Sequence, residues 1–157
     1  MNIFILDHEL AQNAIYHVDD HVKKISLEAA QMLCTARHLM GDDTARYKVV
    51  QPNNPVNKWV RASEMNYVWT CHYGLELCKE YTHRFSKKLF HEQVLWRCLE
   101  TIPNGFKEKT MTPFHQGVYE ENKHSDVVVA YRAYYNQAKR HLFTWTGRGR
   151  PDWITND

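Results

Sequence analysis

Apolar and polar positions follow a helical repeat over most of the chain. From Asp19 or Asp20, the segment HVKKISLEAAQMLCTARHLM places apolar residues at helical spacing, and Gly41 can end the helix. From residue 64 to about residue 89, apolar residues recur at three- and four-residue intervals, which predicts a long core helix. These patterns predict a mainly α fold, a helical bundle.

Shorter segments complete the predicted bundle. The apolar run at residues 2–6 predicts a strand or a buried extended lead-in, and Asp7 can then cap a helix over residues 8–16. Pro55 can open a short helix and Ser63 can cap the long one. Further helices are predicted over residues 90–101 and, capped by Ser125 or Asp126, over 127–145. Residues 102–125 form a loop without periodicity, a length typical of functional or disordered segments.

Size and composition indicate one domain over residues 1–157, with 43% hydrophobic and 24% charged residues. No apolar run approaches the length of a membrane span, and the start MNIFILDHEL lacks the features of a signal peptide. We therefore expect a cytoplasmic protein with no membrane partner. Its four cysteines are spaced too widely for a metal knuckle, so we expect buried free thiols and no cofactor.

One helix carries a polar strip between two apolar rows. On the wheel of the helix that starts near residue 20, Lys23, Ala30 and Arg37 form the predicted solvent face. The lateral strip lies between apolar edges and consists of His21, Lys24, Glu28, Gln31 and Thr35. Such a strip lines a groove, forms a buried hydrogen-bond network or is solvated, and the sequence leaves these alternatives open.

The N-terminal end of this strip holds the densest chemistry in the chain. The free N–H groups of a helix N-terminus, with His21 and Lys24 beside them, can hold a phosphate or an oxyanion. Lys24 is also a candidate amine nucleophile, with Glu28 as its general base or electrostatic partner. The predicted catalytic residues are His17, Asp19, His21, Lys24 and Glu28.

Two metal-like patterns are set aside. The order HxxDH at residues 17–21 lacks a third ligand, and an Asp cap would place His17 outside the helix. The row His72, Glu76, Glu80 and His83 lies away from the apolar stripe, which favours solvent exposure. We predict no metal site.

The C-terminal region combines cations with aromatic rings. Residues 131–150 contain five Lys or Arg and no Asp or Glu, although the net charge of the whole chain is only +2. Cations that contact phosphates and rings that stack on bases are typical of single-strand or flipped-nucleotide binding, whereas core packing is the alternative. The predicted substrate-binding residues are Tyr131, Arg132, Tyr135 and Lys139, with Gln31 from the strip and His115 from the TPFHQG stretch.

Several segments together resemble an uncharacterised family of small proteins encoded by tailed bacteriophages. They are MNIFILD, YHVDDHVKK with LEAAQMLCTA, NNPVNKWVRAS with NYVW, CKEYTHRFSKK, and AYRAYYNQAKRHLFTWTGR with PDW. Where the family has His, Cys, Asp, Lys and His, this chain has His17, Val18, Asp19, Asp20 and His21, so a role at the fourth position is in doubt. Some relatives carry names that suggest pyrimidine-dimer glycosylase activity, for which an N-terminal amine nucleophile would favour a second residue smaller than Asn2.

Two hypotheses follow from these residues and this resemblance. The first is a phage-encoded enzyme that acts on nucleic acid or nucleotides, by base excision or modification in the manner of a DNA glycosylase/lyase. The alternative is a non-catalytic phage protein that binds a nucleotide or a phosphorylated metabolite and sequesters it from host defence. The same residues would serve both.

Overall fold

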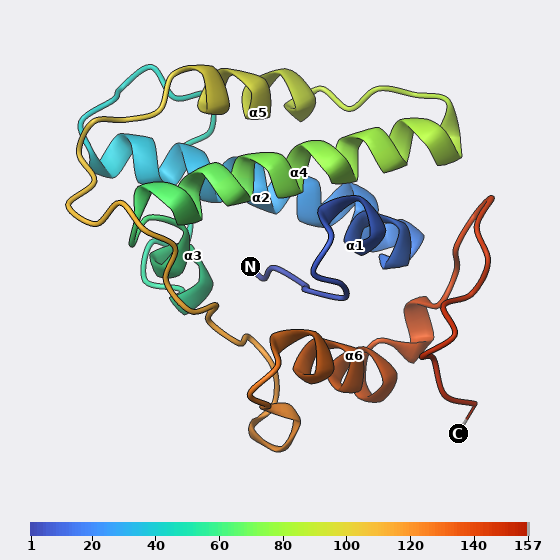
Figure 1. Cartoon of the computed structure of the whole chain (residues 1–157). Coiled ribbons are helices and arrows are strands. Elements are labelled where there is room, and N and C mark those ends of the chain that lie inside the picture. Colours follow the sequence, from blue (N-terminus) through green and yellow to red (C-terminus); the bar gives the residue numbers. More distant parts are fainter. Residues whose placement is uncertain (157) are drawn as a thin grey trace.

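A computed structural model describes residues 1–156, so residue 157 of the predicted domain lies outside the described residues. The described chain is a helical bundle, which confirms the predicted fold class (Figure 1). Its elements are α1 (Leu10–Tyr16), α2 (Asp19–Leu39), α3 (Pro55–Val60), α4 (Glu64–Phe85), α5 (His91–Glu100), the 3-10 turn η1 (Glu120–Asn122), α6 (Val127–Ala138) and the 3-10 turn η2 (Arg140–Leu142).

The long helices α2 and α4 pack closely along their lengths, and α5 covers them on one side (Figure 1). Gly74 of α4 allows this close approach, because a Cβ at this position would lie 2.7 Å from Leu95 Cδ2 and 3.3 Å from the Cβ of Ala29. The helix α6 lies across the N-terminal segment from this layer (Figure 1). The core is therefore built from both layers and from the segment between them.

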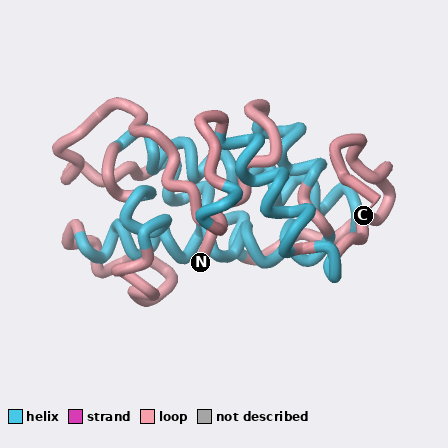
Figure 2. The backbone as a smooth tube through the Cα atoms, turned by 90° about the horizontal axis from the view of Figure 1, so that it is seen from below, coloured by secondary structure: helices cyan, strands magenta, loops and turns pink. Residues whose placement is uncertain are grey.

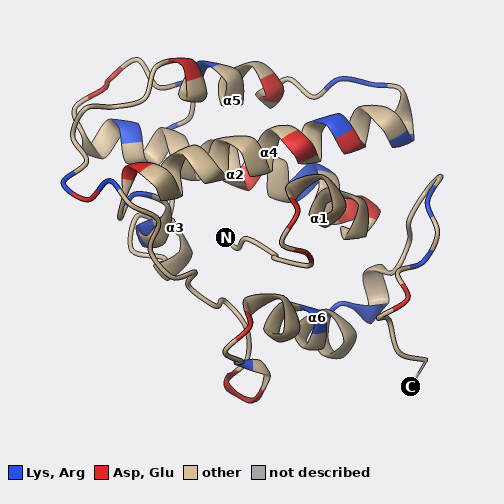
Figure 3. Ribbon diagram, in the orientation of Figure 1, with Lys and Arg blue, Asp and Glu red and all other residues tan. Residues whose placement is uncertain are grey.

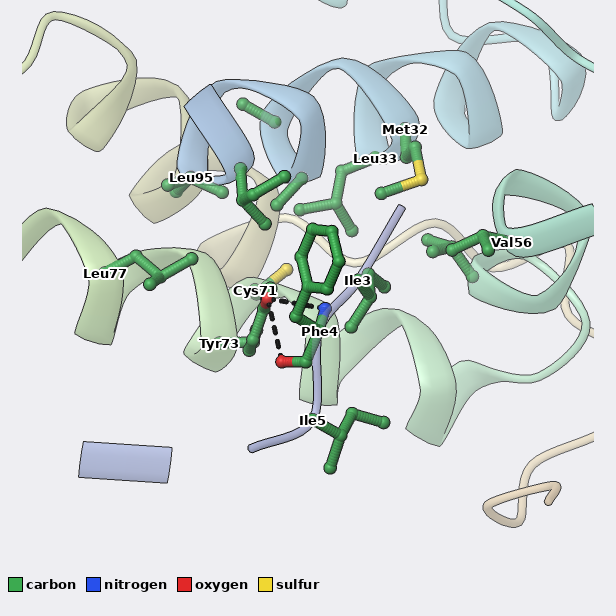
Figure 4. Close-up of a cluster of buried hydrophobic side chains, with 14 of the residues drawn as sticks. Ile3, Phe4, Ile5, Met32, Leu33, Val56, Cys71, Tyr73, Leu77 and Leu95 are labelled. Atoms are coloured by element: carbon green, nitrogen blue, oxygen red, sulfur yellow. Dashed lines mark hydrogen bonds between the residues drawn. The ribbon is translucent and has the colours of Figure 1, made fainter. Parts of the chain in front are cut away.

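The N-terminal segment is a buried extended lead-in, and residues 1–156 contain no strand (Figure 2). Side chains therefore take the place of a neighbouring strand. The Phe4 N–H donates to the Tyr73 hydroxyl at 3.0 Å (Figure 4). The Leu6 N–H donates to Asn13 Oδ1 at 2.9 Å. The Leu6 carbonyl accepts from Arg132 Nε at 2.8 Å. Each of these contacts pairs a main-chain group that would otherwise be buried without a partner.

The structure confirms the helix limits that were predicted from glycine, proline and capping residues. Gly41 follows the end of α2 with a φ of +89°, a conformation that favours glycine. Pro55 is the first residue of α3. The Ser63 side chain accepts from the Asn66 N–H, and Asp126 accepts from the Val128 N–H at the start of α6.

Three helix limits differ from the prediction. The first helix begins at Leu10, because Asp7 accepts the Glu9 N–H in a turn that precedes it. The helix α4 ends at Phe85, because Ser86 adopts a left-handed φ of +53°. The last helix ends at Ala138 and not near residue 145, because the chain turns back and the Thr144 carbonyl accepts the Asp19 N–H at 2.9 Å.

Three predicted solvent positions are wrong. Ala30 and Arg37 on α2 are buried, and Arg37 Nη1 donates to the Thr101 carbonyl at 2.6 Å at the end of α5. Glu80 on α4 is also buried, because Arg84 and Arg148 donate to its carboxylate at 2.7 and 2.8 Å. A wheel places residues on a helix face but does not show which helix or loop covers that face.

The loop over residues 102–125 packs against α3 and α4. The Trp59 Nε1–H donates to the Pro113 carbonyl at 2.9 Å, and its ring stacks on Phe114 with centroids 5.0 Å apart. Asn66 Nδ2 donates to Thr112 Oγ1 at 2.7 Å. None of the helices within residues 1–156 has the length and apolarity needed to cross a membrane.

We expect Tyr73→Phe to destabilise the protein by about 1–3 kcal/mol, because the Phe4 N–H and a ring nitrogen of His17 would both lose a buried partner. The free energy of unfolding from urea titration measures this loss. Tyr81→Phe is the matched control, since the Tyr81 hydroxyl makes no hydrogen bond within residues 1–156. Equal stability of the two variants would contradict this account of the N-terminal segment.

Candidate functional site

Part of the predicted polar strip of α2 opens into a recess. His21, Lys24 and Glu28 line a recess of about 200 Å³, together with Met1, Asn2, Phe4, Ile25, Tyr134 and Lys139. The far end of the strip is different, since Thr35 is buried and its Oγ1 accepts the Val50 N–H at 3.1 Å. The N-terminal part of the strip therefore lines a recess, whereas Thr35 at its C-terminal end is buried and hydrogen-bonded.

His21 is a neutral imidazole at the wall of the recess. Its Nδ1 lies 2.5 Å from the Tyr135 hydroxyl, and its ring stacks on Phe4 with centroids 4.5 Å apart. Burial lowers its pKa to about 3, and the positive charges of Lys139 and Lys24 act in the same direction. Its Nε2 makes no hydrogen bond within residues 1–156, so this nitrogen is available to a ligand.

Glu28 is fixed against the N-terminal segment. Its Oε2 accepts the Asn2 N–H at 3.0 Å, and Asn2 Nδ2 donates to the Gly117 carbonyl at 2.8 Å. Gly117 must be glycine for this contact, because a Cβ there would lie 2.5 Å from Asn2 Oδ1. The carboxylate is therefore positioned by three segments that are far apart in the sequence.

Two ammonium groups complete the recess. Lys139 Nζ lies 5.3 Å from the ring centroid of Tyr134 and 5.8 Å from that of Phe4, within the range of cation–π attraction. Lys24 is exposed on α2, one turn before Glu28. Neither lysine forms an ion pair within residues 1–156. Lys139 belongs to the basic stretch on and after α6 (Figure 3).

The other two predicted catalytic residues lie outside the recess lining. His17 is completely buried, with Nδ1 2.7 Å from the Asn13 carbonyl and Nε2 2.9 Å from the Tyr73 hydroxyl. Burial lowers its pKa to about 4. Asp19 accepts from Arg84 Nη1 at 2.8 Å and from the Thr146 hydroxyl at 2.6 Å. His17 therefore joins α1 to α4, and Asp19 joins α2 to α4 and to the C-terminal tail.

Of the predicted substrate-binding residues, only Lys139 lines the recess. Tyr131 and Tyr135 are core residues, as the packing alternative predicts. The guanidinium of Arg132 binds the Leu6 carbonyl and Asp7 and lies 5.1 Å from the ring centroid of Trp153. Gln31 is half-buried and His115 exposed, and neither belongs to the recess lining.

Sequence reasoning missed the residues that the N-terminal segment brings to the recess, above all Asn2 and Phe4. A signal was present, since an unpaired apolar segment must lie against polar side chains that satisfy its main chain. The sequence does not say that the partner is the α2 strip. Tyr134 was also missed, because three tyrosines lie on α6 and only its folded position separates this one from the two in the core.

Comparison with family models, with curated proteins and with solved structures found no match. Within residues 1–156, His, Cys, Asp and Glu do not form a group of three that could hold a metal ion. The recess is therefore the feature of residues 1–156 that bears on function.

The buried histidines predict a loss of stability in mild acid. His17, His21 and His91 have pKa values lowered by burial to about 4, 3 and 4. Their neutral forms are favoured in the folded state, whereas the unfolded chain protonates near pH 6.5. Their contribution is complete above pH 6.5 and is lost as the pH falls toward 4, by up to about 1.4 kcal/mol per pH unit for each histidine.

Urea unfolding at pH 7.5 and pH 5 measures this loss. We expect His17→Gln to reduce the difference between the two pH values, while His72→Gln, at an exposed position, leaves it unchanged. A pH dependence that is identical in both variants and the parent protein would refute the assignment of the loss to His17.

Proposed function

We propose that the protein is a phage-encoded enzyme that acts on nucleic acid or nucleotides, with the recess as its reacting centre. One observation carries this proposal: an amine, a carboxylate and a neutral imidazole, from Lys24, Glu28 and His21, line the same recess. The amine and the carboxylate are not paired with each other, because Glu28 is bound to the Asn2 N–H instead.

Base excision is the chemistry that this set of groups fits best. Lys24 and Glu28 are one helical turn apart, so their side chains can meet when a nucleotide binds. Glu28 then accepts a proton from the Lys24 ammonium, and the neutral amine attacks C1′ of the nucleotide. The glycosidic bond breaks, and the departing base takes its electron pair and the proton held by Glu28. The second amine proton then passes to O4′ as the C1′–O4′ bond opens, which leaves an imine between Lys24 and the sugar.

The other recess residues match a sugar-phosphate unit. Lys139 and Lys24 supply positive charge for a phosphate, and His21 Nε2 offers a hydrogen bond. The volume of about 200 Å³ is below the range of about 300–1,000 Å³ that encloses drug-sized ligands. The recess therefore suits one sugar with its phosphate, and the Tyr134 ring on its lining is available to an attached base.

A larger neighbouring groove favours a strand as substrate over a free nucleotide. It has a volume of about 710 Å³ and shares Lys24 with the recess. Its lining combines Lys23 with Tyr81, Phe85 and Phe90, cations and rings of the kind that contact phosphates and bases. Asp19 and Asp20 also line the groove. The Asp19 carboxylate already accepts hydrogen bonds from Arg84 and Thr146.

Borohydride trapping on DNA that carries damaged or abasic sites tests this proposal. Borohydride reduces the imine to a stable amine, so we expect a covalent adduct whose peptide map places the sugar on Lys24. Lys24→Arg keeps the charge but removes the nucleophile, and it should abolish the adduct. Lys58→Arg is the matched control, because Lys58 is an exposed lysine that lines neither the recess nor the groove. An adduct that persists in Lys24→Arg, on Lys139 or at the amino terminus, would overturn the role of Lys24.

The second candidate function, sequestration of a phosphorylated ligand, is favoured by the two lysines that lack ion pairs. Glu28→Gln separates the two functions. If the protein is an enzyme, loss of the general base lowers the rate by about 100-fold or more. If it sequesters an anion, removal of a negative charge strengthens binding, measured by calorimetry with a nucleotide panel. Recovery of an unchanged nucleotide with the purified protein would favour sequestration.

A further inference from the structure

A second recess lies at the other half of α2 and holds two of the four cysteines. It has a volume of about 180 Å³ and is lined by Cys34, Arg37, Ala45, Arg46, Phe90, Gln93, Val94, Arg97 and Cys98. Cys34 is on α2 and Cys98 on α5, and both are 2% exposed or less. Cys34 lies ten residues after Lys24, a distance of about 15 Å along a helix. This recess is separate from the proposed reacting centre and its chemistry does not depend on the proposed function.

Cys34 and Cys98 line the same recess, and hydrogen bonding from the Cys98 thiol is the main cause that lowers the pKa of Cys34. Hydrogen bonding from the backbone N–H groups of Tyr47 and Arg46 lowers the pKa of Cys34 further. Together with the nearby charge of Arg37, these donors hold the pKa of Cys34 below its usual range. The pKa values of Cys71 and Cys78 are raised by burial, and neither residue lines the recess. Cys34 therefore forms a thiolate more readily than Cys71 or Cys78, because its pKa is lowered and theirs are raised.

Two arginines at the recess are not neutralised. Arg37 is bound to Thr101 and Asp42, whereas Arg46 and Arg97 form no ion pair within residues 1–156. The Arg46 guanidinium lies 5.3 Å from the ring centroid of Phe90, which also lines the recess. Guanidinium groups in this position can stabilise negative charge that develops on an oxygen during a reaction at Cys34.

We propose that Cys34 and Cys98 form a dithiol site that a peroxide oxidises to a reversible disulfide. The Cys34 thiolate attacks one peroxide oxygen and the O–O bond breaks, which gives a sulfenic acid and a hydroxide that is protonated to water. The Cys98 sulfur then attacks the Cys34 sulfur, the S–O bond breaks and a second water leaves with the Cys98 proton. Two thiols are oxidised and one peroxide is reduced. A peroxide is small enough for a recess of about 180 Å³, where one water needs roughly 30 Å³.

The small size and the burial of this recess disfavour two other reactions of Cys34, which are alkylation by a bulky reagent and disulfide exchange between two copies of the chain. A bulky alkylating reagent does not fit as readily as a peroxide, because the cysteine side chains are at the buried end of a small recess. Disulfide exchange between two copies of the chain would require both thiols to reach the surface. The intramolecular disulfide between α2 and α5 is thus the product that this geometry favours.

Treatment of the intact, folded protein with hydrogen peroxide tests the proposal. Mass spectrometry should show the loss of two hydrogens, and peptide mapping after alkylation should place the disulfide between Cys34 and Cys98. Cys71→Ser and Cys78→Ser, at the two buried cysteines outside the recess, should form the same disulfide at an unchanged rate. Cys98→Ser should stop at a sulfenic acid on Cys34, which mass spectrometry detects as the addition of one oxygen to the peptide that contains Cys34.

A second measurement avoids changes to the buried cysteines. The double variant Arg46→Gln and Arg97→Gln removes two exposed charges, and we expect oxidation to slow by about tenfold, since a hydrogen bond to a charged group has roughly this effect. Arg150→Gln, at an exposed position outside the recess, is the control.

Equal oxidation rates for all four cysteines, a disulfide elsewhere, or no effect of the arginine substitutions would overturn the proposal. Lys24→Arg should oxidise as the parent protein does, so failure here and failure of the proposed function are distinct results.

Discussion

The structure depends on the burial of an extended segment that has no neighbouring strand. Residues 3–6 are almost completely buried, so their main-chain groups need partners inside a helical protein. Tyr73, Asn13 and Arg132 provide them, from α4, α1 and α6. The requirement to satisfy one short segment therefore fixes the relative positions of three helices, and it explains why polar side chains lie in the core.

The same constraint creates the recess. Because the segment lies along α2, the Asn2 N–H reaches Glu28 and the Phe4 ring stacks on His21. The Phe4 ring in turn lies 5.8 Å from the ammonium of Lys139 at the end of α6. One residue thus contacts a histidine on α2 and a lysine beyond α6, which are 118 positions apart in the chain. The groups of the candidate site are brought together by the element that also holds the layers of the bundle.

Sequence patterns predicted the helices well and their surroundings poorly. The limits of α2 and α3 follow from local rules, since Gly41 and Pro55 act on the backbone next to them. The end of α6 depends on a distant contact between Thr144 and Asp19, and no local signal announces it. The burial of Arg37 likewise depends on its contact with Thr101 at the end of α5, more than fifty residues away in the chain. Helix limits that depend on neighbouring residues can be predicted from the sequence. The burial of a helix face by an element far away in the chain cannot.

The candidate site shows the same division at the level of single residues. His17 and His21 are four positions apart and have the same chemistry, yet the first is bound at both ring nitrogens and the second at only one. The difference arises because α1 ends at Tyr16, with His17 as its C-cap, and the next helix begins at Asp19, so the two imidazoles lie on different helices and meet different partners. A side chain that keeps an unused hydrogen-bond donor or acceptor after folding can bind a ligand. A side chain whose polar atoms are all paired stabilises the structure. That capacity is a property of the folded neighbourhood. It is the reason why we propose His21, beside two lysines that form no ion pair within residues 1–156, as the site of ligand binding.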